Sequence, residues 1–375
     1  LMTANLRQDE YSAFAPGKKA GIFWGASAGL TLSEMDFWKN SLGNAINFFR
    51  IRGSYGEVGN NNGIGDFASL STYGSGLYGT NATTGFNQAG NTNLSWETSR
   101  KTDIGINFGL LEDRLTGEIT YFKNDIDGLI LNSPQAPSKG IPGNSIQTNI
   151  GAMQNTGWEF GLTGTIVKKA KFSWTSNFNI AFMQNEVTAL AAGNTDIFTA
   201  TAGLETANII RVGQSIGSLY VVPTDGVDPA TGRRVFINAK GERILYSHVV
   251  PSGQSRWTVQ GTGASSPAVT VAADGKIFGP VLPTYFGAWD NTFRFHGIDF
   301  NVQVQYSGGN YVYNGTKAGL RDQRFWNNEV EILTRWQKDG DVTNIPRPVL
   351  GDNVSNGSSF PISENVEKGD FVRIR

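Results

Sequence analysis

The sequence predicts an all-β fold, and more narrowly a large antiparallel transmembrane β-barrel that is partial, with roughly ten strands. Three observations predict it. The 375 residues include 47 glycines and no cysteine, with only 17% charged residues, a composition poor in helix formers. Apolar and polar residues alternate with period two over long segments. The connections alternate between short and long, as expected for short periplasmic turns and long extracellular loops.

Residues 94–110 carry the strongest alternation, with one mostly apolar row opposed to one polar row. After a tight connection at 111–114 the same pattern continues, which predicts a hairpin. Two further hairpins join 158–166 to 172–182 and 285–295 to 298–306. Weaker candidate strands are residues 1–9, 23–32, 48–56 and 371–375.

The long connections follow residues 56, 124, 183 and 306 and are rich in Gly, Asn and Pro. Residues 184–283 are too long for a structureless loop, so we expect an extracellular loop subdomain inserted between barrel strands, with small strands such as 234–237. Otherwise residues 1–375 form one domain, the C-terminal portion of a barrel. Residues 1–7 lack the features of a signal peptide, which predicts a fragment of a longer product.

Bulk properties exclude several function classes. The formal net charge of -1 provides no field that would attract nucleic acid. No run of 18 apolar residues is present, which argues against a helical membrane span. Without cysteine there is neither a disulfide framework nor a thiolate metal site.

Nothing in the sequence predicts an enzyme, a metal site or a cofactor. The two histidines, His248 in a long loop and His296 in a two-residue turn, lack the setting of a catalytic base. The stretch 225–232 contains two carboxylates but lacks the spacing and terminal Glu of an EF-hand. Residues 60–65 lack the Lys-Ser/Thr ending of a phosphate-binding loop.

Charged residues in the polar rows are candidates for a lumen lining or for acid-base chemistry. Charges of both signs within one row favour cross-strand pairing and a wetted lining over catalysis. The predicted lumen-facing residues are Glu97, Lys101, Asp103, Glu118 and Glu159.

Aromatic residues fall into two groups. Those within strands are predicted to form the membrane girdle, although stacking on sugar rings is the alternative; they are Trp96, Trp158, Trp174 and Trp289. Those in loops are candidates for ligand binding, because exposed loops carry function; they are Tyr73, Tyr78, Tyr220, Tyr311 and Phe325.

An ordered set of short stretches resembles the SusC/RagA family of TonB-linked outer-membrane proteins over nearly the whole chain. The most specific are 94–98 leading to 103–109, 114–117 leading to 121–122, and 149–160. Residues 212–220, 225–232, 343–347 and 369–375 follow in family order.

The resemblance implies a barrel in the bacterial outer membrane, surrounded by lipid and lipopolysaccharide, with an N-terminal plug, a segment coupled to TonB and a SusD-like surface lipoprotein as lid. The sequence departs from this pattern, since we find no plug, no TonB-contacting segment and no closing strands. Barrels with a plugged lumen have about 22 strands. Since the sequence predicts roughly ten strands, we expect it to supply about half the barrel.

The function expected from the resemblance is active import of oligosaccharides or peptides. One alternative is a SusC-like barrel that serves as a structural subunit of a larger outer-membrane complex. Another is a secreted glycan-binding β-sandwich, in which glycine-rich turns and exposed aromatics also occur.

Overall fold

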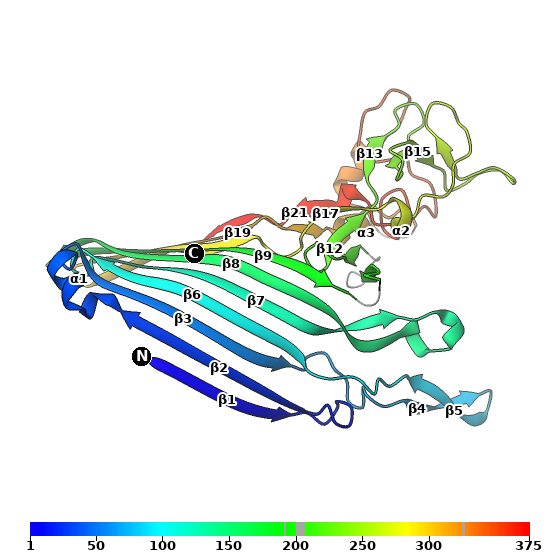
Figure 1. The fold of residues 1–375 in the computed structure, drawn as a ribbon. Helices are drawn as coiled ribbons and strands as arrows, with labels where there is room; N and C mark the ends of the chain where they lie inside the picture. The colour runs from blue at the N-terminus through cyan, green and yellow to red at the C-terminus, as the bar shows by residue number, and fades with distance from the viewer. Residues whose placement is uncertain (191–192, 200–206, 325–326) are drawn as a thin grey trace.

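The computed structural model describes residues 1–190, 193–199, 207–324 and 327–375. Ten strands form one antiparallel sheet in the order β1-β2-β3-β6-β7-β8-β9-β18-β19-β22 (Figure 1). They are β1 (Met2–Glu10), β2 (Ala20–Thr31), β3 (Ile46–Asn60), β6 (Glu97–Leu110), β7 (Leu115–Pro134), β8 (Ser145–Lys169), β9 (Phe172–Ala189), β18 (Tyr285–Phe295), β19 (Ile298–Gly308) and β22 (Phe371–Ile374). The predicted partial barrel wall of roughly ten strands is therefore confirmed.

Several strands exceed the length that a bilayer requires. β7 has 20 residues and β8 has 25, whereas about 9 to 11 tilted residues cross the hydrocarbon region. The sequence pattern had predicted only residues 115–121 and 158–166 of these two strands. The additional residues extend the two strands beyond the length that the hydrocarbon region requires. There both faces of a strand can be polar, so apolar and polar side chains need not alternate.

The connections lie at the two ends of the strands (Figure 1). We call the end with the short turns the short-turn edge and the other end the long-loop edge. At one edge, β6 and β7, β8 and β9, and β18 and β19 are joined by a few residues each. The link between β2 and β3, expected to be short, holds the 3-10 helix η1 (Leu32–Glu34) and α1 (Asp36–Ser41). The long loops leave from the opposite edge, as the alternating lengths predicted.

Two of the tight turns use left-handed backbone. His296 and Gly297 have φ of 48° and 87°, as a two-residue turn of the primed type requires. In the turn between β6 and β7, Leu111, Glu112 and Asp113 all have positive φ. These conformations match the right-handed twist of the flanking strands and fix the register of both hairpins.

A separate hairpin of β4 (Thr72–Tyr78) and β5 (Asn81–Gln88) projects from the long-loop edge. At its base, Phe14, Ala68 and Leu94 form a small buried core on which Trp96 packs. Residues 67–96 contain no charged side chain. The hairpin is thus an uncharged extension of the rim.

The two longest connections fold together into one body, which we call the loop subdomain and define as residues 190–283 and 311–368. Its sheets comprise β10 (Ile197–Thr199), β11 (Asn208–Ile210), β12 (Ser218–Val221) and β17 (Lys276–Gly279), then β13 (Thr224–Val227), β14 (Arg234–Ile237), β15 (Arg243–Tyr246) and β16 (Trp257–Val259), with β20 (Tyr311–Tyr313) paired to β21 (Val366–Lys368). The helices are α2 (Val271–Asp274), α3 (Gly315–Leu320), η4 (Val330–Thr334) and η5 (Ser363–Asn365). Two further 3-10 turns, η2 (Pro137–Lys139) and η3 (Pro142–Asn144), lie between β7 and β8.

These limits differ from the expected subdomain at 184–283. β9 continues to Ala189, so the first residues of that range belong to the wall. The second long connection supplies Ile362, which packs with Val222, Phe236 and Ile244 in a buried core. Sequence order hides this partnership, because the two connections are separated by β18 and β19.

A fully buried arginine also joins the two connections. Arg234 donates from Nε to the Ser355 carbonyl at 2.8 Å, and burial lowers its pKa to about 10. Nearby, Arg321 forms ion pairs with Glu329 and with Glu364, the latter at 3.5 Å. Buried charges need such partners. The Arg234–Ser355 bond links the two connections, and the Arg321 ion pairs stabilise the second connection.

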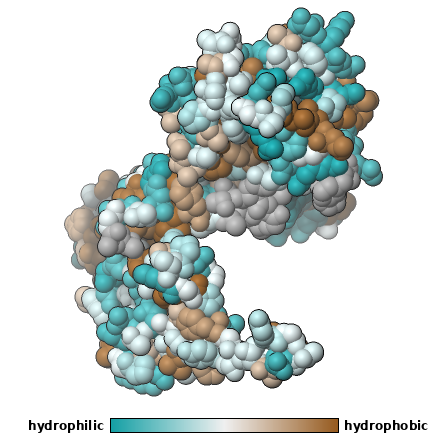
Figure 2. Space-filling model, turned by 90° about the vertical axis from the view of Figure 1, so that its right-hand side faces the viewer, coloured by the Kyte–Doolittle hydropathy of each residue, from teal (hydrophilic) through white to brown (hydrophobic). Residues whose placement is uncertain are grey.

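Figure 2, which looks towards the long-loop edge, shows the loop subdomain above and the rest of the rim curving below it around a hollow. In the described part of the chain, no helix has both the length and the hydropathy needed to cross a bilayer.

Candidate functional site

The strand register places the five predicted lumen-facing residues on one face of the sheet, which we call the polar face. Within a strand, residues two apart share a face, so Glu97, Lys101 and Asp103 of β6 do so. Asn107 pairs with Glu118 of β7, and Thr120 of β7 pairs with Glu159 of β8, which extends the same face over three strands. The face is shared as expected, and its position in the lumen stays a prediction.

At the centre of the polar face, one arginine spans three strands. Arg52 of β3 donates to the Asn107 amide oxygen of β6 at 3.2 Å and to the Thr120 hydroxyl of β7 at 2.6 Å. Its guanidinium also lies 3.5 Å from Glu118, which accepts a bond from Asn107 at 3.2 Å. Gly105 makes room for the crossing, because an added Cβ would lie 3.2 Å from Arg52 Cζ.

The remaining polar-face charges have different surroundings. Glu97 accepts a hydrogen bond from Asn60 at 2.9 Å, and Asp103 accepts one from Ser54 at 3.4 Å. Lys101 and Glu159 are exposed and form no ion pair among the described residues. The face therefore combines paired charges with exposed ones, as a water-filled passage would permit.

The opposite face, which we call the apolar face, is continuous across the sheet. One row of directly paired residues crosses nine strands from β2 to β22, and every member is apolar or aromatic except one glycine. The row is Leu30, Ile51, Ile106, Ile119, Phe160, Ile180, Gly287, Tyr306 and Val372. Many of these side chains are exposed, and Ile104, which lies two residues before Ile106 on the same face, is 57% exposed. An uncovered apolar face of this extent requires an apolar medium.

Towards the long-loop edge, aromatic residues follow the aliphatic rows of the apolar face. Tyr121, Trp158, Phe182 and Tyr285 are paired across four adjacent strands, and the Tyr121 and Trp158 rings are 5.2 Å apart. Beyond them the same face becomes charged. Arg100 lies 3.6 Å from Glu57 and pairs with Asp127, and Lys123 pairs with Asp125 at 3.0 Å.

Three of the four predicted girdle tryptophans lie on the apolar face. Trp174 donates to Asn291 at 3.0 Å and Trp289 donates to Ser176 at 2.8 Å, so their polar groups are satisfied within the wall. Trp158 is the member of the aromatic row described above. Their contact with the membrane interface stays a prediction.

Trp96 differs from the other three. It precedes β6, packs on Phe14 at 5.0 Å and on Phe23 at 5.6 Å, and donates to the Lys19 carbonyl at 2.9 Å. These contacts lie beyond the charged positions of the apolar face. The structure therefore gives Trp96 a packing role at the base of the rim, and a girdle role is not needed to explain it.

The five loop aromatics have separate positions. Tyr73 and Tyr78, on the projecting hairpin, are 68% and 83% exposed. Tyr220 was expected to be available to a ligand, but it is only 5% exposed and packs against Phe198 inside the loop subdomain. Tyr311 covers Gly279, where an added Cβ would lie 2.6 Å from its ring. Phe325 lies outside the described residues.

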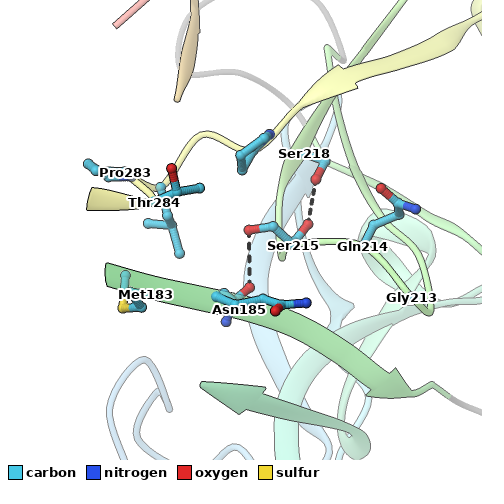
Figure 3. Close-up of a pocket in the computed structure, with 11 residues that line it drawn as sticks. Met183, Asn185, Gly213, Gln214, Ser215, Ser218, Pro283 and Thr284 are labelled. Carbon is cyan, nitrogen blue, oxygen red and sulfur yellow. Dashed lines mark hydrogen bonds between the residues drawn. The ribbon is translucent and has the colours of Figure 1, made fainter. Parts of the chain in front are cut away.

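A cavity of about 420 Å³, the rim pocket, lies where the loop subdomain meets the wall (Figure 3). It is lined by Met183, Gln184, Asn185, Gly213, Gln214, Ser215, Ser218, Pro280, Leu282, Pro283 and Thr284. The lining contains amides, hydroxyls and apolar groups without a formal charge. Such a surface suits a neutral solute that offers both hydrogen-bonding groups and apolar contact.

Asn185 anchors the rim pocket. Its amide nitrogen donates to Asn155 at 2.7 Å, and its amide oxygen accepts from the Ser215 hydroxyl at 3.2 Å and from the Ile216 backbone at 2.7 Å. Residues 213 and 214 also form backbone hydrogen bonds with Val187. The stretch 212–220 therefore lies against β9, while the Gln184 and Gln214 side chains form no hydrogen bond among the described residues.

Sequence reasoning missed the rim pocket and Arg52. None of the predicted aromatics lines the pocket, whose residues come from three separated segments. The signal that was present is the family-like stretch 212–220, which contributes Gly213, Gln214, Ser215 and Ser218.

The structure brings together no catalytic triad in its described part. His248 lies 3.3 Å from the Tyr246 hydroxyl, and His296 packs on Phe295 at the opposite edge of the sheet. The described residues also contain no group of three or more His, Asp or Glu side chains that would hold a metal ion.

Comparison with known proteins agrees with this geometry. The family described as TonB dependent receptor-like, beta-barrel, matches residues 1–213. TonB-dependent receptor P39 of Formosa agariphila is 28% identical over 410 aligned residues, which cover 100% of this chain and 38% of that protein. TonB-dependent receptor SusC of Bacteroides thetaiotaomicron is 29% identical over 240 residues, covering 59% of this chain and 23% of SusC.

Solved structures share the fold. The RagAB peptide transporter aligns with a TM-score of 0.76 and 20% identity, over 99% of this chain and 38% of that one. The open-open state of the RagAB peptide importer gives a TM-score of 0.77 and 20% identity, over 100% of this chain and 37% of the other. The chain thus spans less than two fifths of these relatives.

Proposed function

The chain belongs to the TonB-dependent receptor-like β-barrel family, and from this premise we propose that it forms part of the wall of an outer-membrane importer of the SusC type. The observation that carries the proposal is the two-faced sheet: paired apolar rows on one face and the Arg52 network on the other. In a barrel, one face touches lipid and the other encloses the path of the solute. We assign Glu97, Lys101, Asp103, Glu118 and Glu159 to that path.

The proposed solute is an oligosaccharide or a peptide. The uncharged rim pocket, with the amides of Gln184 and Gln214 and the apolar Met183 and Leu282, suits either backbone amides or sugar hydroxyls. The RagAB peptide transporter supports the peptide, and the resemblance to the SusC/RagA family supports the oligosaccharide as the other solute class. Tyr73 and Tyr78 on the projecting hairpin are proposed to stack on the same solute.

The proposed partners are a SusD-like surface lipoprotein, TonB, and the lipid and lipopolysaccharide of the outer membrane. The relatives support the lipoprotein partner, and the exposed apolar face supports contact with lipid. Energy for import would come through TonB, because a segment of barrel wall has no energy source of its own. We propose no catalytic activity and no cofactor for the chain.

The test is growth of a strain from which the full-length gene is deleted, on defined peptides or oligosaccharides as sole nutrient. We expect loss of growth on one solute class, normal growth on free monomers, and restoration by the wild-type gene. Restoration should fail with Phe160→Arg, which places a charge in the apolar row, and should succeed with Phe160→Leu, which keeps that row apolar.

A second candidate function is a structural subunit of a larger outer-membrane complex. It predicts outer-membrane localisation and heat-dependent gel migration, with no solute-dependent growth defect. The secreted β-sandwich is wrong, because ten strands form a single barrel-type sheet with the family's fold.

A further inference from the structure

A second cavity, of about 670 Å³, lies in the loop subdomain beside the turn 228–232 and the outer face of the β13–β16 sheet. Its lining comprises Asp228, Ala230, Thr231, Arg233, Leu245, Thr258, Val259, Gln260, Gly261 and Gly263. None of these residues lines the rim pocket or belongs to the polar face of the wall. The cavity is therefore a separate feature of the subdomain.

Arg233 is the only cation among the residues that line this cavity. Its Nε is buried and has no hydrogen-bond partner in the described residues. A buried guanidinium donor without a partner is unfavourable, because it has lost water and gained no acceptor. The terminal Nη groups of Arg233, which lies at the cavity wall, also form no hydrogen bond or ion pair among the described residues, so an entering acceptor would bind to them.

The surroundings of Arg233 carry excess positive charge. Burial lowers the pKa of Arg233, and the neighbouring Arg347 lowers it further, against a smaller opposing effect of Asp228. Arg347 forms no side-chain hydrogen bond or ion pair within the described ranges. The repulsion between these two cations would be relieved by an anion bound near Arg233.

Asp228 is already occupied by donors from the protein. Its carboxylate accepts a hydrogen bond from the Gln260 amide at 2.8 Å and another from the Thr231 hydroxyl. It therefore fixes the turn and orients Gln260, and the Arg233 guanidinium forms no ion pair with it or with any other carboxylate in the described ranges. The Thr258 hydroxyl also lines the cavity and has no hydrogen-bond partner among the described residues.

The turn that carries Arg233 is held firmly. The Trp336 indole donates to the Pro229 carbonyl at 2.7 Å, and its ring covers Gly232, where an added Cβ would lie 2.5 Å away. Gly232 has a φ of 69°, which favours glycine for a second reason. The Arg347 backbone N–H also donates to the Gly232 carbonyl at 2.9 Å. The donors are thus positioned before any ligand arrives.

We propose that this cavity binds the oxyanion group of a soluble ligand, with Arg233 as the principal donor and Thr258 as a second one. A planar guanidinium presents paired N–H groups that match the oxygens of a carboxylate, sulfate or phosphate. The proposal goes beyond import, since binding of an anion is measurable without transport.

The test is calorimetric titration of the full-length protein in detergent with sodium sulfate, inorganic phosphate or sodium acetate, at an ionic strength held constant with sodium chloride. We expect saturable binding of at least one anion by the wild type. Stronger binding of sulfate or phosphate identifies a tetrahedral oxyanion, and stronger binding of acetate identifies a carboxylate. Absence of saturable binding for all three anions overturns the proposal.

Arg233→Gln removes the charge and keeps a hydrogen-bonding side chain, so we expect its affinity to fall about tenfold or more. The matched control is Arg256→Gln, which removes an exposed arginine of the same subdomain that does not line the cavity; its affinity should change less than about twofold. Equal affinities of Arg233→Gln and the wild type overturn the assignment.

A third variant covers the case in which Arg233→Gln fails to fold. Arg347→Gln leaves the lining intact and removes only the neighbouring charge, so affinity should fall by a smaller factor, about threefold. Unchanged affinity in this variant contradicts the role given to the two cations.

Discussion

The wall and the loop subdomain are built from the same kind of strand, yet they place apolar side chains in opposite environments. On the wall, Phe300 is 60% exposed and belongs to a face that no other element covers. In the subdomain, Phe236 and Ile244 are fully buried in a core of their own. The hydrophobic effect acts on both, but the wall needs an external apolar medium and the subdomain supplies its own.

The largest expected effect comes from truncating the same residue type in the two regions. Phe236 packs on Trp257 and Phe360, with ring centroids 5.2 and 5.6 Å away. We expect Phe236→Ala to destabilise the loop subdomain by about 3 to 5 kcal/mol, since a cavity is left behind. Phe300→Ala should destabilise the wall by about 1 to 2 kcal/mol, because lipid chains refill the space.

The measurement is urea unfolding of each variant in lipid vesicles, with subdomain and wall followed by separate fluorescent labels. An equal loss in the two variants would show that the wall has a packed protein core of its own and would remove the contrast between the regions.

A charge on each face of one strand sharpens the comparison within the wall. Phe160 and Glu159 are adjacent in β8, are both exposed and point to opposite faces. Phe160→Arg should reduce the free energy of folding into vesicles by about 2 to 4 kcal/mol, as for a charge near the bilayer midplane. Glu159→Arg is the matched control and should change it by less than about 1 kcal/mol.

Equal effects of these two substitutions would contradict the assignment of the faces. A larger effect for Glu159→Arg would reverse it.

Acid should destabilise the loop subdomain through Asp322. Asp322 is nearly fully buried; burial raises the pKa of its carboxyl, but hydrogen bonds from Arg324 outweigh this and hold the pKa below its ordinary value of 3.8. The stabilisation is complete above that ordinary value and is lost as pH falls through the lower folded value. The melting temperature of the subdomain should therefore drop below pH 3.8.

Asp322→Asn cannot be charged, so its melting temperature should be lower near neutral pH and should fall less steeply in acid. Thermal scans between neutral pH and strong acid provide the measurement, and parallel curves for the variant and the wild type would exclude Asp322 as the source.

The smallest effect is expected for the Arg52–Glu118 pair on the polar face. Their side chains are 35% and 52% exposed and 3.5 Å apart, so solvent screens the attraction. A double-mutant cycle of Arg52→Ala and Glu118→Ala should give a coupling of about 0.2 to 0.5 kcal/mol, decreasing in high salt. A coupling of several kcal/mol would mean that the polar face is dry.

The sequence predicted the strands best where alternation is strict. Residues 285–295 were placed to the residue, and 94–110 and 298–306 were placed within three residues at one end, because a period of two specifies both the strand and its faces. Prediction stopped early in β7 and β8, where the strands extend past the apolar layer and both faces carry polar residues.

The candidate site was predicted only in part. The sequence predicted that Glu97, Lys101, Asp103, Glu118 and Glu159 share one face. That prediction rests on side-chain alternation within each strand and on the pairing of neighbouring strands in hairpins, which nearby residues specify. Arg52 was missed because its partners Asn107 and Thr120 lie 55 and 68 residues away in the chain. Tyr220 was assigned to an exposed loop because no nearby sequence pattern reveals that it packs against Phe198.

By itself, the sequence determined that this chain forms a two-faced wall, since side-chain alternation and turn glycines are fixed by local backbone geometry. Only the tertiary structure decided how the two long connections pack into one subdomain, where the rim pocket opens and why the Arg233 Nε has no partner among the residues that the structure describes. These features depend on contacts between distant segments, whose formation no local pattern encodes.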